Sequence, residues 1–308
     1  MLNPYYKILT IFVINLCGAV QVSQAAELDI SQLKQGLQAQ YRSLESTLQS
    51  NQFHAPIYVG SHYEDQSASG EVYAVLPDEF HQVTSNLNTA ANWCDVFLLH
   101  VNVKGCVIDN ASINIKPKQQ ARTHDLVTVY VGREYYQPID DAYSMQYEFS
   151  VPWKQQDYFQ IAMIAKDGPF GTSDYVLTFE AIPLTQSTTF MHLKYAYRYG
   201  VLATIMLNGY LATLGRNKVG FTVKEYDEQH HPIYIKGIEG IVERNSMRYF
   251  LAIQAYLDTI KQGDTDWKAR IIHWYDLAEP FRIQLIEYDE KKYLKSKMKQ
   301  FDIPYKPE

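Results

Sequence analysis

The chain has 308 residues, 20% of them charged, and a formal net charge of −6. A protein that binds nucleic acid needs a concentrated basic surface, so this balance excludes a nucleic-acid partner. The length suits one large domain or two modest ones. Tyrosine is abundant, with 25 residues, and favours surfaces where the ring is buried while the hydroxyl finds a partner.

The first 25 residues are predicted to be a secretory signal peptide. Lys7 precedes an apolar run over 8–20, and small residues stand at the −3 and −1 positions if cleavage follows Ala25. The run is shorter than the roughly 20 residues that span a bilayer. A lipoprotein cysteine at Cys17 is the alternative, but Leu16 before it is larger than such a site accepts. We therefore expect export, and localisation in a bacterial periplasm.

Two cysteines remain after cleavage, Cys94 and Cys106. An even pair in an oxidising compartment predicts a disulfide. A metal site would need more thiolate or imidazole groups at closer spacing, and only His100 lies between the two cysteines. We predict that the two cysteines form a structural disulfide, and that the chain binds no metal and no cofactor.

The segment 26–54 is predicted to hold a polar N-terminal helix over 27–50. Two strands follow in "APIYVG" and "GEVYAVL", and "PDEFHQVTSNL" begins a short helix. The region 143–199 then alternates between apolar and polar residues. Tyr147 and Phe149, for example, share one face while Glu148 and Ser150 share the other. Short turns join these runs, which predicts an antiparallel meander with one covered face.

Helical patterns dominate after Gly200. The uncharged segment 201–215 predicts a helix, 219–237 a hairpin, and 238–260 a long helix that is apolar nearly all round in its second half and therefore buried. Two amphipathic helices are expected near 265–286 and 287–301. The segment 201–215 is expected to be core; the alternative is a gate that touches a membrane transiently while a ligand enters.

The order of these elements resembles the helix-grip fold of START-type lipid-transfer domains and their plant pollen-allergen relatives. The matching stretches are "GEVYAVLPDEFHQVTSNL", the meander 143–199 and "GIEGIVERNSMRYFLAIQAYL". The chain is also similar to a group of secreted proteobacterial proteins. The resemblance implies an α+β fold over about 55–262, with a curved antiparallel sheet around a long C-terminal helix and a cavity for an apolar ligand. The insertion 201–237 and the C-terminal helical extension 263–308 depart from the family pattern.

The resemblance places the ligand site between the sheet and the helix 238–260. The predicted ligand contacts are side chains of the covered sheet face and of the helix: Tyr147, Phe149, Phe159, Ile161, Phe179, Leu193, Tyr195, Tyr197, Asn245 and Arg248. The alternative is that the sheet side chains interlock with the helix and leave no space. For Arg244 and Arg248, structural pairing with acids such as Glu239 or Glu243 is expected more than binding of a head group.

The functional hypothesis is an exported protein that carries or shields an apolar small molecule, such as a lipid or a sterol-like compound. No linear enzyme motif is present. An enzyme of the same fold, acting through cavity acids or His192, is one alternative. An envelope protein that docks a partner through the helices 265–301 is another.

Overall fold

The computed structural model describes residues 17–109, 125–200, 215–263 and 266–301, with the single positions 204, 209 and 213. The chain divides into two units, Met1–Ser43 and Leu44–Glu308, and the second is compact. Helix α1 (Cys17–Gln49) contains the polar helix predicted over 27–50 almost completely. Cleavage after Ala25 stays a prediction.

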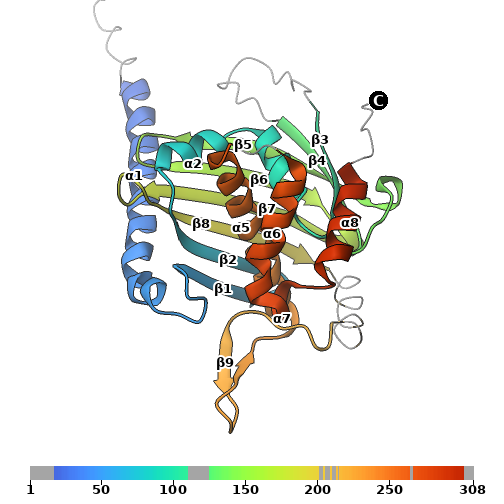
Figure 1. The fold of residues 1–308 in the computed structure, drawn as a ribbon. Coiled ribbons are helices and arrows are strands. Elements are labelled where there is room, and N and C mark those ends of the chain that lie inside the picture. The colour runs from blue at the N-terminus through green and yellow to red at the C-terminus, as the bar shows by residue number, and fades with distance from the viewer. Residues whose placement is uncertain are drawn as a thin grey trace, which may run out of the picture. The chain divides into compact units, whose positions relative to one another are not determined.

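An eight-stranded antiparallel sheet is the framework of the unit Leu44–Glu308 (Figure 1). Its strands follow the order β1-β2-β8-β7-β6-β5-β4-β3. Their bounds are β1 (Ile57–Glu64), β2 (Ser67–Leu76), β3 (Val103–Asp109), β4 (Asp125–Val131), β5 (Tyr143–Lys154), β6 (Phe159–Asp167), β7 (Thr172–Pro183) and β8 (Thr189–Tyr199). The predicted meander 143–199 is confirmed as β5 to β8, because each of these strands pairs with the next in sequence.

The first hairpin shows how local sequence fixes the sheet. Glu64 pairs with Ser67, which leaves Asp65 and Gln66 as a two-residue turn. Both have positive φ angles, 47° and 63°, as a type I′ turn requires, and this turn matches the twist of the flanking strands.

Helices cover one face of the sheet (Figure 1). Their bounds are α2 (Phe80–Asn86), α3 (Ala90–Phe97), α5 (Gly237–Lys261), α6 (Trp267–Ala278), α7 (Arg282–Leu285) and α8 (Glu290–Phe301). The long helix α5 contacts β1, β2 and β8, while α3 lies on β3 and β4 and α6 packs against α5.

The contact between α5 and β2 requires glycine at position 70. A Cβ atom there would lie 2.5 Å from the Val242 carbonyl oxygen and 2.6 Å from Ser246 Oγ. Only a residue without a side chain lets the helix backbone come so close to the strand. Gly70 therefore sets how tightly the sheet holds α5.

The loop between α3 and β3 is tied down at two places. The predicted disulfide joins Cys94 on α3 to Cys106 on β3, with a Cα–Cα distance of 5.4 Å. From α8, Lys297 Nζ donates hydrogen bonds to the carbonyls of Leu98, His100 and Val103 at 2.9, 2.5 and 3.1 Å. The C-terminal extension is thus an integral part of this unit.

Two helices predicted in the C-terminal half differ from the prediction or lie outside the described residues. The helix predicted over 201–215 lies outside the described residues except at the single positions already given. The helix predicted near 265–286 is not continuous: α6 ends at Ala278 and a 3-10 turn, Glu279–Phe281, separates it from α7. Pro280 explains the break, because proline removes a backbone donor and clashes with the preceding turn.

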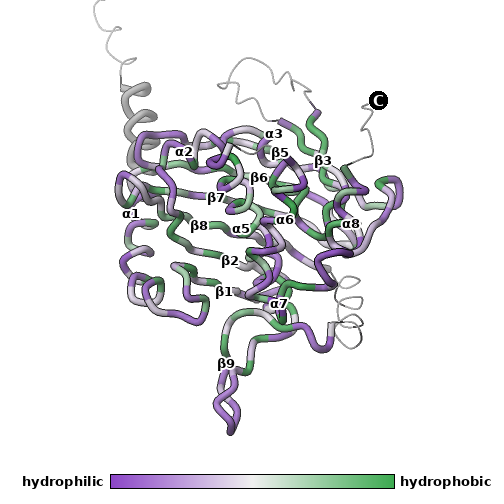
Figure 2. Tube along the Cα trace, in the orientation of Figure 1, coloured by the Kyte–Doolittle hydropathy of each residue, from purple (hydrophilic) through white to green (hydrophobic). Residues whose placement is uncertain are grey.

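The predicted hairpin is present as β9 (Val223–Tyr226) and β10 (Pro232–Tyr234), which pair antiparallel. Its tip is hydrophilic, whereas the strands of the large sheet mix hydrophobic and hydrophilic residues along their length (Figure 2). In the described part of the chain, no helix has the length and apolar character needed to cross a membrane. The unit Leu44–Glu308 has the α+β fold that the sequence predicts, with the long helix α5 packed on one face of an antiparallel sheet.

Candidate functional site

The structure brings the predicted sheet residues together on the face that α5 and α3 cover. All eight are buried: Tyr147 and Phe149 on β5, Phe159 and Ile161 on β6, Phe179 on β7, and Leu193, Tyr195 and Tyr197 on β8. Ring contacts join this face to the helices. The Tyr195 and Tyr249 ring centroids lie 5.4 Å apart, and those of Phe97 and Tyr147 lie 6.0 Å apart.

One end of this face is closely packed. Phe159, Ile161, Phe179 and Leu193 have no accessible surface. The Phe179 ring contacts Trp93 of α3 and Phe159, with centroid distances of 6.2 and 6.3 Å. The side chains at this end interlock and leave no accessible surface. That these residues contact a ligand stays a prediction.

The other end holds five tyrosines, which we call the tyrosine cluster: Tyr147, Tyr175, Tyr195, Tyr197 and Tyr249. Tyr175 lies 5.9 Å from Tyr195 and 5.1 Å from Tyr197 between ring centroids. Three of the five, Tyr195, Tyr197 and Tyr249, keep 7–8% of their surface accessible although they lie in the interior.

The hydroxyls of the tyrosine cluster are short of protein partners. Tyr175 donates to Thr172 Oγ1 at 2.8 Å. Within the described part of the chain, the hydroxyls of Tyr147, Tyr195, Tyr197 and Tyr249 make no hydrogen bond. A tyrosine hydroxyl in the interior usually has a partner, so these four hydroxyls are available to water or to a bound molecule.

Burial keeps these phenols protonated. It raises the pKa of Tyr175 to about 12. For Tyr147 and Tyr195 burial raises the pKa well above the usual value, and neighbouring tyrosines add to the shift. Deprotonation of any of these tyrosines would place an anion among apolar rings, which is unfavourable. The cluster therefore keeps its O–H donors throughout the physiological pH range.

His100 and Asn245 lie beside the cluster. The His100 imidazole is 3% exposed and stacks on Tyr249 with a centroid distance of 4.7 Å. Its Nδ1 accepts a hydrogen bond from the Asn102 backbone N–H at 3.2 Å. The half-buried Asn245 amide lies next to the imidazole, yet no group in the described residues stands in hydrogen-bond geometry to Nε2. The polar contact predicted at Asn245 is thus placed at the site, and its contact with a ligand stays a prediction.

Arg248 is held by the protein itself. Its Nη2 donates to Glu287 Oε1 at 2.6 Å and to the Leu285 carbonyl at 3.2 Å. Lys218 also forms an ion pair with Glu287. Structural pairing was expected for Arg248, but with other acids. Glu287 was missed because the kink at Pro280 redirects the chain that carries it.

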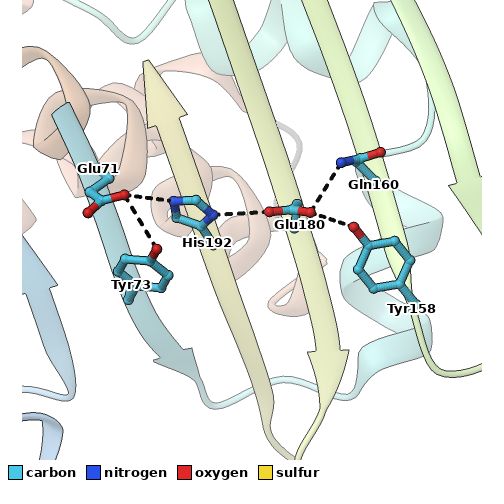
Figure 3. Close-up of polar contacts among 6 residues, drawn as sticks. All are labelled: Glu71, Tyr73, Tyr158, Gln160, Glu180 and His192. Atoms are coloured by element: carbon cyan, nitrogen blue, oxygen red, sulfur yellow. Dashed lines mark hydrogen bonds and ion pairs between the residues drawn. The ribbon is translucent and has the colours of Figure 1, made fainter. Parts of the chain in front are cut away.

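His192 lies on the opposite face of the sheet (Figure 3). Its ring nitrogens face two carboxylates, Glu180 Oε2 at 3.1 Å and Glu71 Oε2 at 3.2 Å. The Tyr73 ring stacks on the imidazole at 4.2 Å, and Tyr158 and Gln160 donate to Glu180. Because both ring nitrogens face carboxylates, this arrangement favours the protonated imidazole, which donates from both nitrogens.

The pKa values of this group follow from the same contacts. Burial acts to lower the pKa of His192, but the hydrogen bonds to Glu180 and Glu71 raise it overall. The hydrogen bond from His192 is the main cause that lowers the pKa of Glu71. For Glu180, burial acts to raise the pKa, but the bonds from His192 and Tyr158 lower it overall. These charges clamp β2, β8 and β7 together, away from the tyrosine cluster.

Two hollows are described in the molecule, and neither is lined by the tyrosine cluster. An open groove of about 740 Å³ lies between α6 and α8, and most of its lining is charged: Lys268, Glu290, Lys291, Leu294, Lys295, Met298 and Lys299. A void of about 10 Å³ lies beside Val101 and Trp274, which is room for about one water molecule. Among the described residues, no cluster of three or more His, Cys, Asp or Glu side chains is arranged to hold a metal ion.

Three members of the site were not predicted as ligand contacts. Tyr175 shares the strand face of Phe179, and Tyr249 follows Asn245 by four residues on α5. The spacing in the sequence could therefore have identified both. No local sequence pattern could have identified His100, because its place beside Tyr249 depends on the disulfide and on α8.

No family model and no curated protein matches the sequence. Several solved structures are similar to parts of this chain. The ZhuI aromatase/cyclase from Streptomyces sp. R1128 is 12% identical, covering 63% of this chain and 94% of that one, with a TM-score of 0.39. Human StAR-related lipid transfer protein 5 is 7% identical, covering 75% and 97%, with a TM-score of 0.34. A START superfamily protein from Mycobacterium smegmatis is 13% identical, covering 47% and 93%, with a TM-score of 0.30.

Proposed function

We propose that this chain binds an apolar small molecule, such as a lipid or a sterol-like compound, between the sheet and α5 beside the tyrosine cluster. The carrying observation is the set of hydroxyls on Tyr147, Tyr195, Tyr197 and Tyr249, none of which has a hydrogen-bond partner among the described residues. A ligand that supplies polar groups at this place would complete them.

The surroundings suit such a ligand. Binding sites for small molecules are lined mainly by apolar and aromatic side chains, with a few polar groups that set orientation. Here the rings of Phe97 and Tyr249, with a centroid distance of 5.7 Å, supply apolar surface. The tyrosine hydroxyls and Asn245 supply the polar groups.

The binding protein is proposed to act after export, in a bacterial periplasm. The signal-like segment 1–25 and the disulfide between Cys94 and Cys106 support this placement, because disulfides persist in oxidising compartments. Fractionation of the host with N-terminal sequencing is the test: a periplasmic protein that begins at Ala26 supports export, and an uncleaved cytoplasmic protein contradicts it.

An enzyme acting through His192 is not favoured. The imidazole lies on the sheet face away from α5, and two carboxylates and a stacked tyrosine already surround it. Chemistry at that position would not reach a molecule held beside the tyrosine cluster.

Thermal unfolding with fractions of a host membrane extract tests the binding proposal. Ligand at 100 times its Kd stabilises by about 2.7 kcal/mol, which raises the Tm of a protein of this size by roughly 5–10 °C. Tyr195→Trp adds volume inside the site, whereas Tyr73→Trp adds it on the opposite face.

We expect at least one fraction to raise the Tm of the wild type and of Tyr73→Trp but not of Tyr195→Trp. If no fraction stabilises the wild type, or if Tyr195→Trp is stabilised equally, the proposed binding site is wrong. Docking through α6 and α8 would then be the better reading.

A further inference from the structure

We propose that the interior site selects ligands whose apolar body carries a carbonyl oxygen, and that His100 and Tyr249 donate the hydrogen bonds that recognise this oxygen. The inference rests on the proposed function, since it names the chemical class of the molecule bound beside the tyrosine cluster. The main observation behind the inference is the buried Nε2–H group of His100, which has no hydrogen-bond partner among the described residues.

The position of the proton on His100 follows from its contacts. Burial, with the nearby cations Arg248, Lys297 and Lys104, lowers the pKa of this imidazole well below its usual value, so the ring is neutral. Nδ1 accepts the Asn102 backbone N–H at 3.2 Å and therefore carries no proton. The single ring proton is on Nε2, which makes Nε2–H a donor.

The Asn245 amide lies beside this donor and acts to raise the pKa of His100, but no acceptor among the described residues stands in hydrogen-bond geometry to Nε2. Leaving a buried donor unpaired is unfavourable, and native structures seldom do so without a reason. His100 is only 3% exposed, so bulk water does not readily replace the missing acceptor. A bound ligand is the simplest source of one.

The neighbouring groups are donors too. Tyr249 stacks on His100, and its phenol makes no hydrogen bond in the described part of the chain. Burial raises the pKa of Tyr249, so its O–H stays intact. Tyr195 lies 5.4 Å from Tyr249 between ring centroids and is also without a hydrogen-bond partner there. Tyrosine hydroxyls can also accept a hydrogen bond, but neither of these two stands in hydrogen-bond geometry to His100 Nε2.

A carbonyl oxygen would satisfy these donors. It accepts two hydrogen bonds and donates none, which matches one imidazole N–H and one phenol O–H on two stacked rings. A hydrocarbon would bury the same area but leave both donors unpaired, and sites built around hydrogen bonds reject analogues that lack the partner.

Matched pairs of ligands measure this selectivity. 2-Acetylnaphthalene and 2-ethylnaphthalene have similar size and differ by the carbonyl oxygen, as do 4-acetylbiphenyl and 4-ethylbiphenyl. Isothermal titration calorimetry of the mature, disulfide-bonded chain gives the Kd for each compound. The variants are His100→Phe, which keeps an aromatic ring, and Tyr249→Phe, which removes one oxygen atom. Tyr73→Phe removes a hydroxyl on the opposite sheet face and is the control.

We expect the wild type and Tyr73→Phe to bind the acetyl member of a pair about 10–100-fold more tightly, because two hydrogen bonds distinguish it. Each site variant should reduce this ratio by about 3–10-fold and leave the Kd of the ethyl compound nearly unchanged. Equal binding of acetyl and ethyl compounds, or a ratio that both variants preserve, would overturn the carbonyl inference while the proposed function stands. If no member of either pair binds, the carbonyl inference fails for these probes, and the unfolding test with membrane-extract fractions decides the proposed function.

Discussion

Glu243 offers a stringent test of how α5 is anchored. Its side chain is buried with no accessible surface. Oε2 accepts from the backbone N–H groups of Phe221 and Thr222 at 2.5 and 2.9 Å. Oε1 accepts from Ser61 Oγ and Thr222 Oγ1 at 2.8 and 2.6 Å. One carboxylate thus joins α5 to β1 and to the segment before β9.

Two substitutions separate the parts of this interaction. Glu243→Leu leaves two buried N–H donors unpaired, and each costs about 1–3 kcal/mol, which gives roughly 4 kcal/mol in total. Glu243→Gln keeps a carbonyl for the two N–H groups, while its amide can donate to the two hydroxyls. It loses mainly the charge assistance, about 1 kcal/mol for each N–H bond, or roughly 2 kcal/mol.

Urea unfolding followed by circular dichroism measures both losses, with the disulfide intact so that one transition is analysed. Glu228→Gln, in the exposed tip of the β9–β10 hairpin, is the control and should change the free energy of unfolding by less than about 0.5 kcal/mol. If the Leu and Gln variants of Glu243 lose the same free energy, the carboxylate does not serve the two backbone donors as described.

Three further outcomes are expected, each from urea unfolding. The raised pKa of His192 means that its stabilising contribution is complete below about pH 6.5 and is lost as the pH rises through the raised value. The difference between wild type and His192→Gln should therefore shrink from pH 5.5 to pH 8.5, and an unchanged difference would exclude a charged imidazole. Gly70→Ala puts a Cβ 2.5 Å from the Val242 carbonyl oxygen and should cost about 1–3 kcal/mol; a neutral result would mean that α5 is free to move away. Replacing Cys94 and Cys106 together by serine opens a loop with a sequence separation of 12 and should cost about 3 kcal/mol, whereas no loss would show that the staple is dispensable.

Alternation in the sequence predicted the meander and the face that it turns toward α5. This worked because side-chain direction in a strand has a period of two and depends only on neighbouring residues. The same signal was present in β4, where Val127 and Val129 are buried, but no strand was predicted there. β3 is harder to predict because its pairing with β4 shifts between Val103 and Gly105.

Partners distant in sequence could not be predicted. His192 lies 121 residues from Glu71, and Arg248 lies 39 residues from Glu287, so no local pattern connects either pair. The same holds for His100, whose loop is held in place by Lys297 from the other end of the unit. Sequence periodicity predicted which sheet residues are buried, whereas the polar groups beside them are visible only from the tertiary contacts.

The central claim is that an apolar molecule occupies the interior beside Tyr195 and Tyr249. Mass spectrometry of the protein, purified gently from its own host, tests it most directly when native spectra are followed by solvent extraction. We predict a stoichiometric mass excess that extraction releases as one class of apolar compound. A clean protein that also stays empty after incubation with a membrane extract would contradict the claim.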